Sequence, residues 1–251
     1  MKFAHVVLFL SFLSLPRGTW AQDVVLDEER FHSPQRWALD LRMGPFLPNV
    51  DSEFEGGAAP YREFFGRKRS ILTQIGLEYQ VFQRFGTLAV GGTVGYFTKK
   101  ARAFVDPTNG SRPTERSGDT TRLSAYPFSA SLIYRMDVAA RRYGFPIVPY
   151  GKLGLNYSVW TVYNGNNTVA SGEAFGGRGR GGTLGWHGSL GVSFLLDVLD
   201  MGSAREFDRD MGVNHTYAFF ELTHIDAKGL GQKNKLHLGG DTWLVGLLFE
   251  F

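Results

Sequence analysis

The sequence predicts an all-β protein that folds as a closed, antiparallel, up-and-down transmembrane β-barrel, most simply one of eight strands. Three observations favour this fold class. Stretches of about ten residues alternate between apolar and small or polar side chains, which is the period of a strand with one lipid-facing side. Long polar, Gly-rich segments alternate with shorter connections. Of the 251 residues, 32 are glycine and 14% are aromatic, and aromatic residues favour strands and membrane interfaces.

The N-terminus predicts export. Lys2 precedes an apolar run over residues 3–15, and a small residue, Ala21, stands at a suitable cleavage point. A membrane anchor is the alternative, but the run is shorter than the roughly 20 residues that a spanning helix needs. An exported barrel of this kind is expected in the bacterial outer membrane. We therefore expect a signal peptide at residues 1–21, a polar lead-in at 22–34 and the barrel at 35–251.

Charge and cysteine content exclude several functional classes. The chain holds 27 basic and 24 acidic residues, and loss of Lys2 and Arg17 with the signal peptide would leave 25 basic residues. Such a small net charge does not indicate nucleic-acid binding. Cysteine is absent, which excludes a disulfide framework, a thiolate metal site and a lipid-bearing N-terminal cysteine. We expect no cofactor, no metal and no nucleic-acid partner.

Alternating segments in the first half of the chain predict four strands. In the first, apolar residues lie opposite Asp40 and Arg42, and prolines end the strand. In the second, Glu78 lies opposite a row of apolar residues and must point into the lumen, because a lipid-facing carboxylate would be too costly. The third has small residues on its inner face. These strands are expected at residues 37–44, 70–81, 87–96 and 125–134.

The second half predicts four more strands with the same alternation. Lys152 falls on the inner face of the fifth strand and Glu221 on that of the seventh. His187 and Ser189 share the inner face of the sixth. We also place Asp241, at the start of the last strand, in the lumen. These strands are expected at residues 148–162, 183–194, 215–224 and 236–251.

The connections alternate in length, as in barrels whose termini both lie on the periplasmic side. Residues 135–146 form a charged connection on that side. Residues 197–210 hold apolar side chains among charges without strand alternation, which predicts a short amphipathic periplasmic helix packed under the barrel. The long connections, expected outside the cell, are residues 49–66, 99–120, 163–182 and 226–235.

The last strand carries a further signal. A final strand that ends on phenylalanine, with apolar residues at alternate preceding positions, resembles the C-terminal signal of bacterial outer-membrane barrels. The resemblance implies recognition by the barrel-assembly machinery. The residues that carry it are Trp243, Val245, Leu247, Phe249 and Phe251.

A family resemblance covers nearly the whole mature chain. It rests on four segments: Ser33–Trp37, Tyr61–Gly66, Val148–Gly154 and Met211–Tyr217. Together they resemble a myxobacterial-type outer-membrane β-barrel family, which implies the fold and the location. That family has no established reaction or ligand, so the resemblance implies no catalytic or binding residue.

An eight-stranded barrel is too narrow for an open channel once side chains fill it. We therefore expect a non-enzymatic structural or surface-interaction protein that works through its long external loops. A small-solute pore is the alternative, and it would need ten or more strands, with a hairpin hidden in residues 99–121 or 161–182. A soluble barrel of the lipocalin type would need an apolar interior, and the polar, Gly-rich faces have too little bulk to form one.

An enzymatic alternative rests on His187 and Ser189. Their His-x-Ser spacing resembles the motif of outer-membrane lipid A deacylases, in which histidine activates serine for acyl transfer. Alternation places both residues in the lumen, however, and no acid on that strand could orient the histidine. A hydrogen-bonded polar pair in the lumen is the simpler interpretation.

Polar residues near the outer connections give two further candidates. Basic residues could bind lipopolysaccharide phosphates, for which arginine has the right geometry, although solvated loop charge is the alternative. These are Lys99, Lys100, Arg102, Arg178 and Arg180, the last two in an Arg–Gly run that indicates an external loop rather than a nucleic-acid tract. A metal site would need His215, His224, His237, Asp226 and Asp241 to converge on one ion; hydrogen bonds to loops are the alternative.

Overall fold

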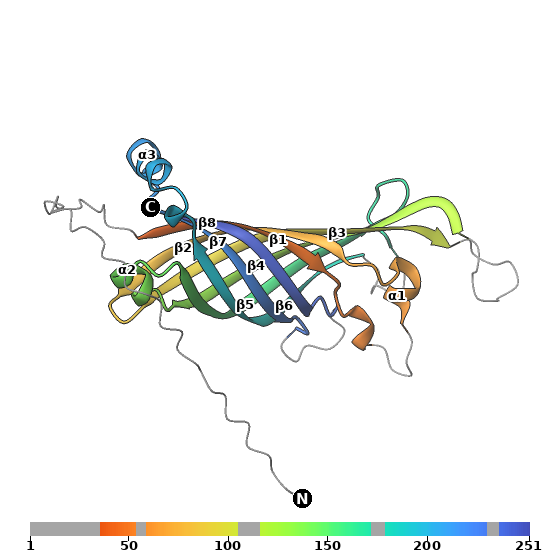
Figure 1. Ribbon diagram of the computed structural model, residues 1–251. Coiled ribbons are helices and arrows are strands. Elements are labelled where there is room, and N and C mark those ends of the chain that lie inside the picture. The colour runs from red at the N-terminus through yellow and green to blue at the C-terminus, as the bar shows by residue number, and fades with distance from the viewer. Residues whose placement is uncertain (1–35, 54–58, 105–115, 172–178, 230–235) are drawn as a thin grey trace, which may run out of the picture. The chain divides into compact units, whose positions relative to one another are not determined.

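Eight strands close into one barrel in sequence order, each antiparallel to the next (Figure 1). β1 and β8 complete the closure, with Leu41 opposite Leu247. The prediction of an eight-stranded antiparallel barrel is confirmed. The computed structural model describes residues 36–53, 59–104, 116–171, 179–229 and 236–251. The expected signal peptide and lead-in lie outside the described residues.

Strand length divides the barrel into a short side and a tall side. β1 (Trp37–Phe46), β7 (His215–Asp226) and β8 (Gly240–Glu250) have 10, 12 and 11 residues, close to the roughly 9–11 that cross a bilayer. β3 and β4 have 18 and 20 residues. We call the end at which these two strands project the hairpin end, and the end at which β1 begins and β8 finishes the terminus end. The taller strands are β2 (Ser70–Gln83), β3 (Thr87–Phe104), β4 (Arg116–Arg135), β5 (Ile147–Tyr163) and β6 (Arg180–Leu195).

The β3–β4 hairpin corrects one predicted loop. The sequence predicts a loop over residues 99–120, but β3 runs to Phe104 and β4 begins at Arg116. The register continues through this segment, with Lys100 opposite Arg122. In the same way, β6 begins at Arg180, inside the third predicted loop, and Arg180 pairs with Thr161 of β5. The described residues of both segments lengthen existing strands and add none, so they supply no extra hairpin for a wider pore.

The helix predicted near residues 197–210 is present as α3 (Met201–Met211). It begins where it does because the carboxylate of Asp200 caps the first N–H groups, and it ends before Gly212, whose φ of +70° suits glycine. No residue of α3 is buried, so it does not pack under the barrel as expected. The other short helices are η1 (Val50–Glu53), α1 (Pro60–Phe65), α2 (Val138–Tyr143) and η4 (Leu196–Val198).

Among the described residues, no helix is both long enough and apolar enough to cross a bilayer.

Side-chain alternation separates an apolar outer face from the lumen. On β2, Ile71, Ile75 and Leu77 are exposed, whereas Leu72 and Glu78, which have the opposite parity, are buried. The same alternation continues round the barrel. The apolar side chains on the outside and the buried polar ones inside are the inverse of a soluble barrel.

Aromatic rings gather on the outer face near both ends of the wall. At the terminus end, Trp37 and Tyr79 lie with ring centroids 4.9 Å apart. Toward the hairpin end, the rings of Tyr96 and Tyr126 are 5.3 Å apart. Two such belts are typical of a β-barrel that crosses both interfaces of a membrane.

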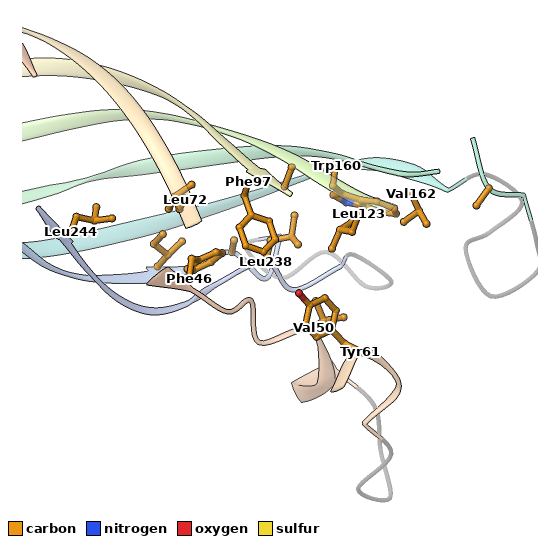
Figure 2. Packing of buried hydrophobic residues seen from close by; sticks show 14 residues of the cluster. Phe46, Val50, Tyr61, Leu72, Phe97, Leu123, Trp160, Val162, Leu238 and Leu244 are labelled. Carbon is orange, nitrogen blue, oxygen red and sulfur yellow. The ribbon is translucent and has the colours of Figure 1, made fainter. Parts of the chain in front are cut away.

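An apolar cluster fills the lumen toward the hairpin end (Figure 2). Leu72 and Phe97 are 2% and 1% exposed, and the ring of Phe97 meets that of Phe46 edge to face at 5.4 Å. Val50 of η1 and Tyr61 of α1 belong to the same cluster, so the β1–β2 connection covers it. The sequence did not predict this interior, because several of its large side chains come from strand ends and connections.

Glycines on the inner face make room for large lumen side chains. A Cβ at Gly76 would lie 2.2 Å from a carboxylate oxygen of Asp40, and one at Gly191 would lie 2.4 Å from the ring of Tyr150. Both distances are far below van der Waals contact. The small inner residues therefore accommodate charged and aromatic neighbours and do not leave the lumen open.

Candidate functional site in the lumen and at the outer rim

Seven charged side chains fill the lumen between the apolar cluster and the terminus end, and we call them the ionic cluster. Six strands contribute to it, and every member is at most 8% exposed. Its four carboxylates face three cations. The members are Asp40, Arg42, Glu78, Arg135, Lys152, Glu221 and Glu250.

Each cation of the ionic cluster contacts two carboxylates. Arg42 donates from Nε to Asp40 at 2.6 Å and from Nη1 to Glu221 at 3.1 Å. Lys152 donates to Glu78 at 3.0 Å and lies 3.5 Å from Glu221. These bonds join β1, β2, β5 and β7 across the lumen.

Arg135 extends the ionic cluster toward the terminus end. Its guanidinium pairs with Glu78 and lies 3.5 Å from Glu250. Gln80 donates a hydrogen bond to Glu250 at 2.9 Å, and the hydroxyl of Tyr150 donates one to Glu221 at 3.0 Å. Such bonds offset part of the desolvation cost of burying the charges.

The lumen therefore contains most of the polar residues that the sequence proposes for it. Glu78, Lys152 and Glu221 are central members of the ionic cluster. The sequence also placed Asp40 and Arg42 on an inner face but did not single them out. Charged residues on inner faces are the signal that could have found them. Arg135 and Glu250 were missed as candidates because each lies at the end of a strand. The sequence assigned Arg135 to the connection over residues 135–146.

Asp241 is not in the lumen. It has the same parity as Trp243 on β8, and its side chain is 83% exposed. Its carboxylate accepts from Nδ1 of His224 at 2.6 Å, across the β7–β8 ladder on the outer face. The prediction that Asp241 lies in the lumen is therefore wrong. Residues two positions apart on a strand share a face, and Trp243 faces outward.

His187 and Ser189 both lie in the lumen but do not bond to each other. Nε2 of His187 is 3.0 Å from Oγ of Ser131, and Oγ of Ser189 is 2.9 Å from that of Thr223. A cavity of about 20 Å³ lies beside them, enough for about one water molecule. Because His187 bonds to Ser131 and Ser189 to Thr223, the His-x-Ser pair is not arranged as a serine–histidine catalytic pair in this structure.

The candidate metal-binding histidines lie apart. His215 lies at the terminus end and pairs with Asp197 at 2.7 Å. His224 faces outward toward Asp241, whereas His237 is buried against Ser52 of η1. Burial lowers the pKa of His237. Among the described residues, no group of three potential ligands could hold a metal ion.

The basic residues proposed to bind phosphate divide into two sets. Lys99 faces the inner side and donates to the backbone oxygen of Lys68. Lys100, Arg102 and Arg180 are exposed and, by alternation from Tyr96 and Leu184, face outward. Arg178 lies outside the described residues.

Arg122 was not predicted from the sequence as a phosphate-binding residue, but it lies beside the basic residues that face outward. It lies opposite Lys100 in the β3–β4 register, and its guanidinium covers the ring of Tyr163 at 4.8 Å. Lys100 is four residues beyond Tyr96 of the aromatic belt. We call Lys100, Arg102, Arg122 and Arg180 the basic row.

Arg116 serves a different purpose. Its guanidinium lies 3.8 Å from the ring centroid of Phe104 and donates to the backbone oxygens of Phe64 and Glu63 at 3.0 and 2.9 Å. It therefore ties α1 to the projecting hairpin. Arg116 makes three hydrogen bonds to backbone oxygens within the chain, whereas Arg122 makes a longer bond, to Asn167 at 3.3 Å. We therefore leave Arg116 out of the basic row.

Comparisons with known proteins give likenesses of fold. No protein-family model matches the sequence, and no curated protein does. The chain is similar in structure to Ail, the attachment invasion locus protein of Yersinia pestis, at 10% identity and a TM-score of 0.39, over 86% of this chain and 97% of Ail. The same protein in complex with the heparin analogue sucrose octasulfate gives 9% identity and a TM-score of 0.41 over the same shares.

The chain is also similar to the outer membrane enzyme PagL, at 12% identity and a TM-score of 0.35, over 85% of this chain and 98% of PagL. At such low identities these likenesses concern the fold alone. An outer-membrane β-barrel family fits them, but they give no support to the myxobacterial-type family in particular.

Proposed function

We propose that this chain is a bacterial outer-membrane β-barrel that acts at the cell surface as an interaction protein, and neither as a pore nor as an enzyme. The observation that carries the proposal is the filled lumen. The apolar cluster occupies its hairpin-end half. The other half holds the ionic cluster and a second group of buried apolar side chains that includes Tyr217 and Leu248, so the described residues leave no path for a solute. The working surface is therefore outside the barrel.

The outer face supports the membrane location. Between the two aromatic belts, the outward side chains of the eight strands carry no charge. Hydrocarbon tolerates such a face only on a closed barrel, because each backbone N–H and C=O must find a partner within the protein. Export by the signal peptide at residues 1–21 and assembly through the C-terminal strand, from Trp243 to Phe251, belong to the same proposal.

The projecting hairpin supports a surface role. Eight residues separate Tyr96 in the outer aromatic belt from Phe104 at the end of β3, which at about 3.3 Å per residue is roughly 26 Å of strand. α1 packs against this hairpin through the rings of Phe64 and Phe104, 5.7 Å apart. A paired and braced hairpin presents a preformed surface, which lowers the entropic cost of binding a partner.

The basic row gives this surface one partner class, the phosphate groups of lipopolysaccharide. Its outward cations lie just beyond the aromatic belt, where the headgroups of the outer leaflet would be. Charge-assisted hydrogen bonds from lysine and arginine to phosphate are among the stronger ones in proteins. The basic row replaces the set of phosphate-binding residues predicted from the sequence, because Lys99 faces inward.

Planar-bilayer conductance tests the closed lumen. The purified chain should insert, as shown by faster gel mobility before boiling, and should give no stable conductance steps. Reproducible steps from heat-modifiable protein would overturn the proposal in favour of a pore. Unchanged lipid A mass on overexpression is expected as well, and deacylated lipid A would establish the hydrolase.

A matched pair of triple variants tests the basic row. Lys100→Gln, Arg102→Gln and Arg122→Gln together should reduce the lipopolysaccharide that copurifies with each barrel. The control, Arg67→Gln, Lys68→Gln and Lys228→Gln, removes the same charge from exposed residues outside the row and should retain it. Equal losses in the two variants would mean that general surface charge attracts the lipid, and the row would have no special role.

A further inference from the structure

The helix α3 has one apolar face and one charged face. Ala204, Phe207 and Met211 recur at the spacing of one helical face. The opposite face carries charges of both signs, two of them on Arg205 and Glu206. No residue of α3 is buried, and Phe207 and Met211 are 40% and 64% exposed. The helix touches η4 and β7, but the fold leaves Phe207 and Met211 of its apolar face exposed.

The helix is well fixed at both ends. Asp200 accepts from the backbone N–H groups of Gly202 and Ser203 at 3.0 and 3.1 Å. Before it, Asp197 accepts from His215 at 2.7 Å and from the backbone N–H of Thr216 at 3.0 Å. These bonds hold the start of α3 against the start of β7.

Its position is level with the aromatic belt of the terminus end. Just after α3, the backbone N–H of Asn214 donates to the carbonyl of Glu250 at 2.7 Å, between Phe249 and Phe251. Before α3, the exposed side chains of Val198 and Leu199 continue the apolar outer surface of β6. Figure 1 shows α3 projecting to one side from the rim at the terminus end, near the C-terminus, and not across the opening of the barrel. The residues on both sides of α3 thus attach the helix to the terminus-end rim of the lipid-facing surface.

We propose that α3 is an interfacial helix whose apolar face lies among the phospholipid headgroups of the periplasmic leaflet. This inference rests on the proposed membrane location. Amphipathic helices with a strong apolar face and low mean hydropathy lie in the plane of such an interface. Because the polar face of α3 carries both signs of charge, it suits zwitterionic headgroups, which present a phosphate and an amine together.

The absence of cysteine allows the helix to be probed one position at a time. Single variants Phe207→Cys and Met211→Cys report on the apolar face, and Glu206→Cys on the charged face. Leu190→Cys, on the lipid-facing wall of β6, serves as the reference for membrane insertion. Each is labelled with an environment-sensitive fluorophore in phosphatidylcholine vesicles that contain quenchers at the headgroup or at mid-chain depth. Heat-modifiable mobility establishes that every variant folds.

We expect labels at 207 and 211 to shift to the blue and to lose emission to the headgroup quencher, and the label at 206 to do neither. The label at 190 should respond to the mid-chain quencher. Quenching at 190 but not at 207 or 211 would overturn the inference and leave the membrane barrel standing. No quenching at 190 would overturn the membrane location and the inference with it. If emission at 207 changed with protein density but not with the quenchers, the apolar face would bind a second copy of the chain. That result would also overturn the inference.

Discussion

The two halves of the lumen are built on the same strand alternation, but only the terminus-end half holds the ionic cluster, beside a second group of buried apolar side chains that includes Tyr217 and Leu248. Toward the terminus end, Arg42, Arg135 and Lys152 neutralise carboxylates from other strands. Toward the hairpin end, Leu72, Phe97 and their neighbours form a small hydrophobic core. The difference shows that the lumen of a narrow barrel can be filled in two ways. The stability of the ionic cluster depends on every charged partner being present, whereas that of the apolar cluster depends on the volume of its side chains.

Loss of Glu78 should give the largest effect. Glu78→Ala leaves Arg135 and Lys152 with an incomplete set of buried partners, and breaking a buried pair from one side costs about 3–5 kcal/mol. We expect the free energy of unfolding, measured by urea titration in vesicles, to fall by that amount. High salt should not restore it, because buried pairs are poorly screened.

Asp241→Asn is the matched control for Glu78→Ala. It removes an exposed carboxylate on the outer face and should change the free energy of unfolding by less than about 0.5 kcal/mol. Equal effects of the two variants would show that burial in the ionic cluster does not determine the cost.

Truncation in the apolar cluster should have a somewhat smaller effect. Leu72→Ala creates a cavity and should lower the free energy of unfolding by about 2–4 kcal/mol, whereas Leu72→Met, which conserves volume, should cost less than about 1.5 kcal/mol. The same urea titration measures both. If Leu72→Met were as damaging as Leu72→Ala, volume would not be what matters in this half, and the contrast with the ionic cluster would fail.

The smallest effect concerns α3, outside both halves. Hydrogen bonds from the Ser203 hydroxyl and backbone N–H lower the pKa of Asp200. A lowered folded-state pKa stabilises the helix above the ordinary aspartate value of about 4, and this stability is lost as the pH falls through the folded-state value. Helix content should therefore decrease in acid by far-ultraviolet circular dichroism while the barrel persists.

Asp200→Asn tests that assignment. Asparagine keeps the capping geometry without the titrating charge, so the acid-dependent loss of helix content should disappear. If it persisted in the variant, another group would be responsible.

Predictions from the sequence succeeded where one local pattern decides the outcome. Glu78, Lys152 and Glu221 lie inside because alternation along each strand places them there. They failed where the outcome depends on a neighbouring strand. Lys99 and its neighbours continue a strand because β4 pairs with them, although their composition is typical of a loop. The error at Asp241 is of another kind, because alternation along β8 from Trp243 already places Asp241 on the outer face.

The sequence by itself determined the barrel class, the face on which nearly every strand side chain lies and the apolar signal of the last strand, because these follow from a two-residue period. It favoured eight strands but left ten or more open. Only the tertiary structure decided which lumen residues meet. Arg42 and Glu221 are 179 positions apart, and Phe46 reaches Phe97 from a different strand. Closure of the barrel sets those contacts, since it fixes the register of every strand against the next and brings opposite walls within reach of one side chain.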